Sequence, residues 1–150
     1  MQVVLFNARS IKNKLADLHY LLSTTSAQII CITETWLNST VSDSVIIGDN
    51  NHHIFRKDRH DDSVGGGVCI LVSNAAPSAV PVKLPTKFDC LEIICIDLLD
   101  DIGNRPIRII TIYRPPANDR DVLAVQHAKL LFECLDYLCN CKIRVVVWRF

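Results

Sequence analysis

The 150-residue sequence contains no apolar run near the roughly 18 residues that a membrane-spanning helix needs. It has no excess of charge, because 16 basic side chains balance 16 acidic ones. Its first residues, Met1–Asn7, lack the basic segment and long apolar stretch of a signal peptide. We therefore expect no membrane partner. A nucleic acid would have to be held by a local basic patch and a metal ion, because no global positive field is present.

The seven cysteines lack the pattern of a disulfide framework or a zinc site. Their number is odd, and three of them lie inside apolar runs, as buried free thiols do: Cys31, Cys69 and Cys95. The C-terminal cysteines have no second Cys or His pair at ligand spacing. This usage favours a reducing intracellular compartment, the nucleus or the cytoplasm.

Repeats and low-complexity segments are also missing, so residues 1–150 are expected to form a single domain. Hydrophobic residues make up 49% of the chain and charged residues 21%, which indicates a globular protein with a sizeable core. A β-α-β pattern over residues 3–33 and an antiparallel pair over 90–98 and 107–112 predict an α/β chain with mixed sheets.

Two helices are predicted from apolar spacing and capping residues. The first begins after Ser10 as N-cap and has Arg9, Lys12 and Lys14 near its start, where they either contact phosphate or are simply solvated. The second is capped by Asn118-Asp119 and runs to about residue 139. A last strand is predicted at residues 143–147.

One carboxylate follows the most apolar strand of the sequence. Ile29–Ile32 is an uninterrupted run of buried-strand type, and Glu34 lies just beyond its end. In open α/β sheets, ligands bind at the carboxyl ends of parallel strands. A hard oxygen ligand at that position suits Mg²⁺ or Mn²⁺, although a Glu after a strand is also common as a solvated side chain.

Two other strands end in a polar residue in the same way. Asn7 follows Val3–Phe6, where an amide serves either a ligand or a turn. Tyr113 follows Ile107–Ile112. Its phenol could donate to a phosphate oxygen, act on a proton if its pKa is lowered, or only be half-buried.

The middle of the chain carries a charged loop and a glycine triplet. Residues 56–62 contain both signs of charge and are interpreted as a surface loop that contacts substrate. His52 and His53 nearby do not complete a metal-ligand spacing. Gly65–Gly67 lacks the Lys-Ser/Thr of a P-loop, so the triplet predicts a close approach of two backbones at a strand start.

Four motifs occur in order along the chain: Asn7-Ala8-Arg9-Ser10-Ile11, Ile32-Thr33-Glu34-Thr35-Trp36-Leu37, Arg56-Lys57-Asp58-Arg59 with Gly65-Gly66-Gly67-Val68, and Tyr113-Arg114-Pro115-Pro116. Together they resemble the endonuclease/exonuclease/phosphatase superfamily. Within it, the chain is most similar to the apurinic-endonuclease-like domain of LINE-type non-LTR retrotransposons.

The resemblance implies two mixed β-sheets packed face to face with outer helices, a DNase I-like sandwich. It implies Mg²⁺-dependent phosphodiester cleavage, with Mn²⁺ possible and DNA as the partner. Glu34 would be the metal ligand, Asn7 would belong to the phosphate and metal network, and Tyr113 would stabilise phosphate oxygens. The residues that would contact substrate are Arg9, Arg56, Arg59 and Arg114.

The sequence departs from the family pattern at two places. Arg9 stands where some DNA-repair relatives have an Asp, which favours the retrotransposon branch. Trp148-Arg149-Phe150 stands where the family has Gly-Asp-x-Asn, and the later general-base His motif is absent from residues 1–150. None of the histidines lies in such a motif: His19, His52, His53, His60 and His127.

We therefore expect a C-terminally incomplete domain that binds metal weakly and does not cleave DNA alone. The strand at Val145–Val147 would expose an edge and an apolar face, which predicts poor folding or aggregation. Two alternatives are a catalytically dead remnant that only binds, and another branch such as a phosphoinositide phosphatase or a sphingomyelinase. The Arg-Ser-Ile after Asn7 and the Arg-Pro-Pro after Tyr113 favour the retrotransposon branch.

Overall fold

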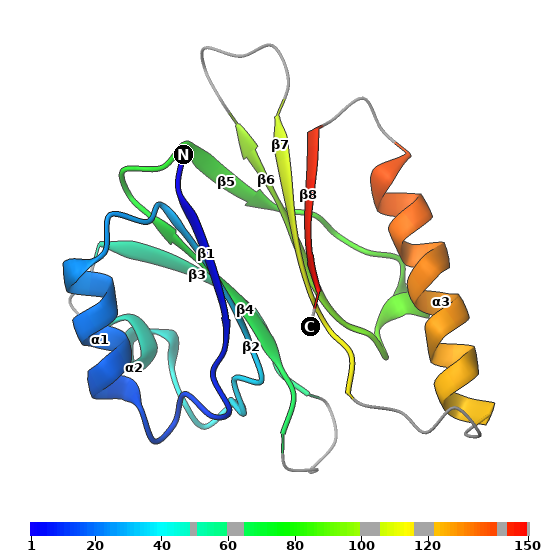
Figure 1. The fold of residues 1–150 in the computed structure, drawn as a ribbon, viewed down its shortest axis with the longest axis horizontal. Coiled ribbons are helices and arrows are strands. Elements are labelled where there is room, and N and C mark those ends of the chain that lie inside the picture. Colours follow the sequence, from blue (N-terminus) through cyan, green and yellow to red (C-terminus); the bar gives the residue numbers. More distant parts are fainter. Residues whose placement is uncertain (49–50, 60–64, 100–105, 116–121, 141–143, 150) are drawn as a thin grey trace.

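The computed structural model describes residues 1–48, 51–59, 65–99, 106–115, 122–140 and 144–149. Two four-stranded mixed sheets pack face to face, and helices cover the outer side of each sheet (Figure 1). This architecture confirms the predicted sandwich. The strand order is β1-β2-β4-β3 in the first sheet and β5-β6-β7-β8 in the second.

The first sheet contains the predicted β-α-β unit, whose strands β1 and β2 are parallel. Strand β4 lies antiparallel to both β2 and β3. The elements of this layer are β1 (Val3–Asn7), α1 (Leu15–Thr24), β2 (Ile29–Thr33), α2 (Asp43–Ile47), β3 (His52–Lys57) and β4 (Val68–Ser73).

The second sheet contains the predicted antiparallel pair, β6 and β7, and ends in a parallel pairing of β7 with β8. Strands β5 and β8 are therefore the two edge strands of this sheet. The elements of this layer are β5 (Ser78–Pro81), the 3₁₀ turn η1 (Thr86–Phe88), β6 (Glu92–Leu99), β7 (Ile107–Tyr113), α3 (Val122–Cys139) and β8 (Arg144–Arg149). None of the helices in the described ranges is long and apolar enough to cross a membrane.

Strand β2 is buried along its whole length because both of its faces are covered. Ile29 and Cys31 face the second sheet, where they meet Ile96 and Ile109. Alternate residues face outward beneath the helices of the first layer: Ile30, Ile32, Cys69 and Leu71. This double burial explains why the strand appears in the sequence as an unbroken apolar run.

Helix α1 begins at Leu15, so the prediction that Ser10 is its N-cap is wrong. The backbone N–H groups of Ser10 and Ile11 donate to carbonyls of the segment after β2, each at 2.9 Å. The Lys14 ammonium also donates to the Ala8 carbonyl at 2.5 Å. These contacts hold residues 8–11 alongside the neighbouring loop, and the chain turns into a helix only afterwards.

Two short elements have no strong signal in the sequence. Helix α2 is only five residues long, and the His19 ring nitrogen Nε2 lies 3.1 Å from the carbonyl oxygens of Val45 and Ile46. Strand β5 ends in Pro81 and lies at the edge of its sheet, a position that tolerates proline. The predicted Asn118-Asp119 cap and part of the 56–62 loop lie outside the described residues.

Candidate functional site

Three strand ends meet at one end of the sandwich. Because β1 and β2 are parallel and paired from Val3 to Asn7, their carboxyl ends lie together and bring Asn7 beside the loop that carries Glu34. Strand β7 of the second sheet ends there too, and the Tyr113 hydroxyl donates to Glu34 Oε1 at 2.7 Å. The Asn7 side chain also hydrogen-bonds Glu34. Residues predicted from three separate strands therefore form one cluster.

The loops after β1 and β2 adopt left-handed backbone conformations. Glu34 has φ 51° and Trp36 has φ 54°, while Arg9 and Ser10 have φ 44° and 81°. The two loops hold each other, for example through Ser10 N–H to the Glu34 carbonyl at 2.9 Å. Non-glycine residues in this region are strained by about 1–3 kcal/mol each, and such strain is characteristic of functional sites.

The glycine triplet supports the Glu34 loop from the other side. The Thr35 N–H donates to the Gly67 carbonyl at 3.2 Å and the Trp36 N–H to the Gly66 carbonyl at 2.9 Å. Gly67 has φ +81°, and a Cβ there would lie 2.5 Å from the Thr35 Oγ1. The predicted close approach of two backbones at the start of β4 is confirmed.

The hydrogen bond from Tyr113 lowers the pKa of Glu34 below its ordinary value of 4.5, and smaller contributions in the same direction come from Asn7, Trp36 and Arg9. Partial burial opposes these effects. Burial, together with the bond to Glu34, raises the pKa of Tyr113 to about 12. At neutral pH the pair therefore consists of an ionised carboxylate and a protonated phenol. Tyr113 can donate a hydrogen bond, but it is not poised to accept a proton.

Stability should depend on the ionisation of Glu34 in a defined direction. Because the folded-state pKa lies below 4.5, the contact contributes stability above pH 4.5 that is lost as the pH falls through the lowered value. The substitution Tyr113→Phe removes the largest cause, so we expect the Glu34 pKa to return toward 4.5. A ¹³C NMR titration of the Glu34 carboxyl carbon measures both values. An unchanged pKa in Tyr113→Phe would contradict this assignment.

The structure separates the four arginines predicted to contact substrate. Arg9 is exposed and close enough to Glu34 to lower its pKa. Arg114 lines a cavity of about 450 Å³ beside Tyr113. Arg56 instead donates to the carbonyls of Val41 and Asn38 and pairs with acidic side chains of its own layer, so it anchors the loop before β3.

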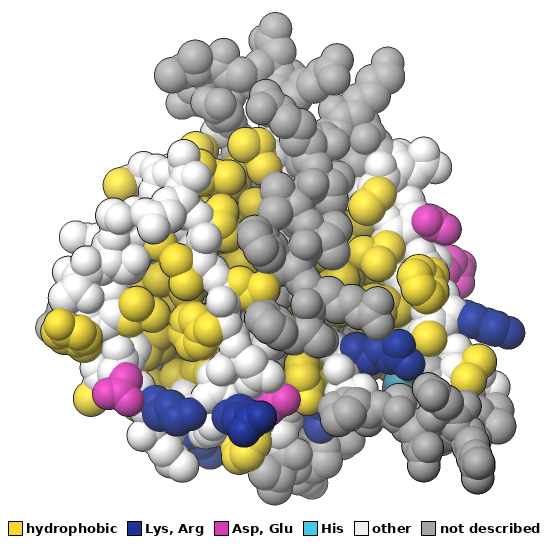
Figure 2. Space-filling view, viewed as in Figure 1, with side chains coloured by type: hydrophobic (Ala, Val, Ile, Leu, Met, Phe, Trp, Pro, Cys, Tyr) yellow, Lys and Arg dark blue, Asp and Glu magenta, His cyan; other side chains and the backbone are white. Residues whose placement is uncertain are grey.

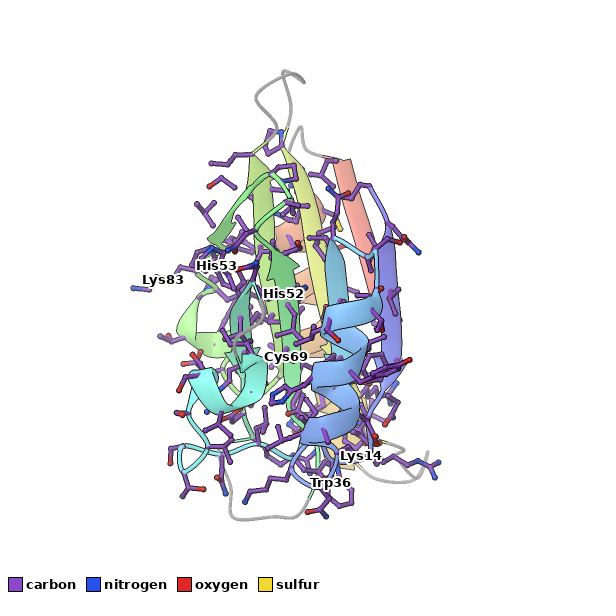
Figure 3. All side chains as sticks on the ribbon, turned by 90° about the vertical axis from the view of Figure 1, so that its left-hand side faces the viewer. Lys14, Trp36, His52, His53, Cys69 and Lys83 are labelled. Atoms are coloured by element: carbon purple, nitrogen blue, oxygen red, sulfur yellow. The ribbon has the colours of Figure 1, made fainter. Side chains whose placement is uncertain are left out.

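Arg59 is also committed to an internal partner, because its guanidinium donates to Glu92 Oε1 from Nε at 2.7 Å and from Nη2 at 2.5 Å. Basic side chains still gather at the lower end of the face shown in Figure 2, the end at which β1 terminates (Figures 1 and 2). Figure 3 shows Lys14 and Trp36 at this end, with His52 and His53 well away from it.

The donor set at Glu34 fits a weakly held magnesium ion. No cluster of three His, Cys, Asp or Glu side chains occurs among the described residues. Asn7 Oδ1 accepts from the Arg9 N–H at 3.1 Å, so its amide nitrogen is the atom that serves Glu34. In the part of the chain that the structure describes, Glu34 is the carboxylate that these three strand ends offer, and Mg²⁺ bound by a single carboxylate keeps most of its waters.

Glu92 was missed by the sequence analysis. It lies at the start of β6 with its side chain 12% exposed, and besides Arg59 it accepts from the Gly67 N–H at 2.5 Å. The signal in the sequence is a charged residue within an apolar strand, but nothing local identifies its partners.

Comparisons of the sequence find no matching family model and no matching curated protein. Solved structures do match. The 3′ phosphatase NExo from Neisseria, bound to a product DNA hairpin, has a TM-score of 0.75 and 16% identity, covering 99% of this chain and 56% of its own. The Xenopus laevis APE2 catalytic domain has a TM-score of 0.76 and 16% sequence identity, and the match covers 99% of this chain and 57% of that one. An AP endonuclease from Archaeoglobus fulgidus has a TM-score of 0.70 and 16% sequence identity, and the match covers 99% of this chain and 56% of that one.

The chain thus spans a little over half the length of these proteins. At 16% identity the likeness concerns the fold. The two facing sheets, their outer helices and the structures they match give this chain a DNase I-like fold, which it shares with these solved proteins.

Proposed function

We propose that residues 1–150 form the metal- and phosphate-binding part of a Mg²⁺-dependent DNA endonuclease domain of LINE retrotransposon type. The observation that carries the proposal is an ionised Glu34, held by Tyr113 and Asn7 at the end of a DNase I-like sandwich. The order of the four motifs and the nuclease folds that the chain matches support it.

In this proposal each residue has a distinct task. Glu34 would bind the ion, which when present neutralises charge on a phosphoryl group. The Tyr113 phenol, kept protonated by its raised pKa, would turn from Glu34 to a phosphate oxygen and donate there. Arg9 and Arg114 would contact the DNA backbone, and Asn7 would orient Glu34.

A binding-only protein is the second candidate. The observation in its favour is that Trp148-Arg149-Phe150 stands where the family pattern has Gly-Asp-x-Asn. Hydrolysis needs a positioned water and a base as well as charge stabilisation. When members of a catalytic unit are removed, what persists is binding and residual charge stabilisation.

We expect residues 1–150, expressed alone, to bind duplex DNA in a salt-dependent manner without cleaving it. Fluorescence anisotropy with plain and abasic duplexes measures binding, and inositol phosphates as competitors test the other branches. Supercoiled-plasmid nicking with Mg²⁺ or Mn²⁺ measures cleavage. Nicking by the original chain that disappears in Glu34→Ala would show that residues 1–150 are themselves a nuclease. Displacement of the DNA by inositol phosphates would instead favour a phosphatase branch.

A further inference from the structure

Glu92 links the two sheets next to the candidate site. Although it belongs to β6 of the second sheet, its carboxylate is bound by segments that flank strands of the first. Oε1 accepts from Arg59 Nε and Nη2, just after β3, and Oε2 accepts from the Gly67 N–H, just before β4. Charge-assisted contacts of this length are strong and directional.

The contacts of Glu92 close a ring around the candidate site. Glu92 is the register partner of Tyr113 across the β6–β7 ladder. Tyr113 donates to Glu34, and the next residue, Thr35, donates its N–H to the Gly67 carbonyl. The Gly67 N–H donates to Glu92 Oε2, which completes the ring. Each sheet therefore contributes one carboxylate, and each carboxylate is bound from the other sheet.

Directional contacts are needed here because most of the remaining interface between the sheets is apolar. Ile29, Ile96 and Ile109 fill the space between the sheets. Their contacts are non-directional and do not fix how far one sheet is shifted along the other. A hydrogen bond of 2.7 Å, such as that between Tyr113 and Glu34, weakens steeply when its distance or angle changes.

We propose that Glu92 is a positioning residue. By binding Arg59 and the glycine triplet of the first sheet to the second sheet, it holds Tyr113 within hydrogen-bond distance of Glu34. The inference rests on the proposed function in one respect, because the pair it positions is the one assigned to phosphate and metal binding. The clamp itself is testable in the chain without DNA or metal.

The test measures the Tyr113–Glu34 hydrogen bond at neutral pH in Glu92→Ala. With ¹³C-labelled tyrosine, the Tyr113 Cζ shift in Glu34→Ala defines the signature of the broken bond. We expect Glu92→Ala to move this shift most of the way to that signature, and Glu92→Gln, which keeps an oxygen for the Gly67 N–H, to move it less. The matched control is Glu133→Gln, because Glu133 is an exposed carboxylate paired with Lys87 on the surface.

A second measurement uses unfolding by urea. If Glu92 positions the pair, the loss of stability caused by Tyr113→Phe should fall to less than half in the Glu92→Ala background and stay unchanged in the Glu133→Gln background. A residue with a merely structural role would lower stability without moving the Tyr113 signature. An unmoved Cζ shift in folded Glu92→Ala, or in Glu92→Gln if the alanine variant does not fold, overturns the proposal. If the shift moves but the chain binds no DNA, the clamp stands and the proposed function fails.

Discussion

Substitution of Glu34 by glutamine is expected to abolish the response of this chain to divalent metal. Glutamine keeps the size of the side chain and an oxygen acceptor for the Tyr113 hydroxyl, but it removes the negative charge that Glu34 supplies at the meeting point of the three strands. Mg²⁺ requires that charge, because a neutral amide oxygen does not repay the loss of its bound waters. The effect should be complete rather than partial.

The measurement is a titration with Mg²⁺ by calorimetry, and with Mn²⁺ by paramagnetic broadening of the Asn7 and Tyr113 resonances. The original chain should bind weakly, with broadening confined to the site, and Glu34→Gln or Glu34→Ala should show none. Glu133→Gln, which removes an exposed carboxylate on α3, should behave like the original chain. Tight binding by the original chain, or binding that survives the loss of Glu34, would contradict the assignment of Glu34 as the metal ligand.

The second large effect is expected from Gly67→Ala, which should lower the free energy of unfolding by about 3 kcal/mol. A left-handed conformation costs an L-residue about 1–2 kcal/mol, and overpacking adds about 1–3 kcal/mol. Both apply, because Gly67 has φ +81° and a new Cβ would lie 2.5 Å from the Thr35 Oγ1. Thr35 is fully buried and cannot move aside easily. Urea denaturation measures the loss.

Gly65→Ala is the matched control for this substitution. Gly65 also has a positive φ, +110°, but the nearest atom to its Cβ position is the Trp36 indole nitrogen at 3.7 Å, an ordinary contact. Its loss of stability should be limited to the backbone contribution. Thr35→Ala combined with Gly67→Ala should recover part of the loss, because the clashing oxygen is gone. Equal losses for the Gly65 and Gly67 variants would show that the close approach is unimportant.

The positions of Asn7, Glu34 and Tyr113 at strand ends follow from the sequence alone. A buried strand is identified by its apolar run, and the residue that terminates the run is necessarily at the end of the strand. The β-α-β rule then brings β1 and β2 into parallel contact, so Asn7 and the Glu34 loop meet. The glycine triplet is equally local, because glycine takes positive φ values without strain and has no Cβ to obstruct the close approach.

The tertiary structure decided how the two sheets meet. The bond between Tyr113 and Glu34 joins residues 79 positions apart, and the bond between Arg59 and Glu92 spans 33. Hydrophobic periodicity indicates which face of a strand is buried, but it carries no information about which side chain of another sheet lies opposite. For the same reason the sequence did not show that Arg56 and Arg59 are engaged internally.

Ser10 illustrates this limit on a smaller scale. It has the residue type and position of a helix N-cap, yet backbone contacts with the Glu34 loop keep it out of α1. Local preference determined most of the elements of this protein and the residue types at their ends. Contacts between distant segments determined the start of α1, the role of Glu92 and the ionisation of Glu34, because these depend on packing geometry that exists only in the assembled sandwich.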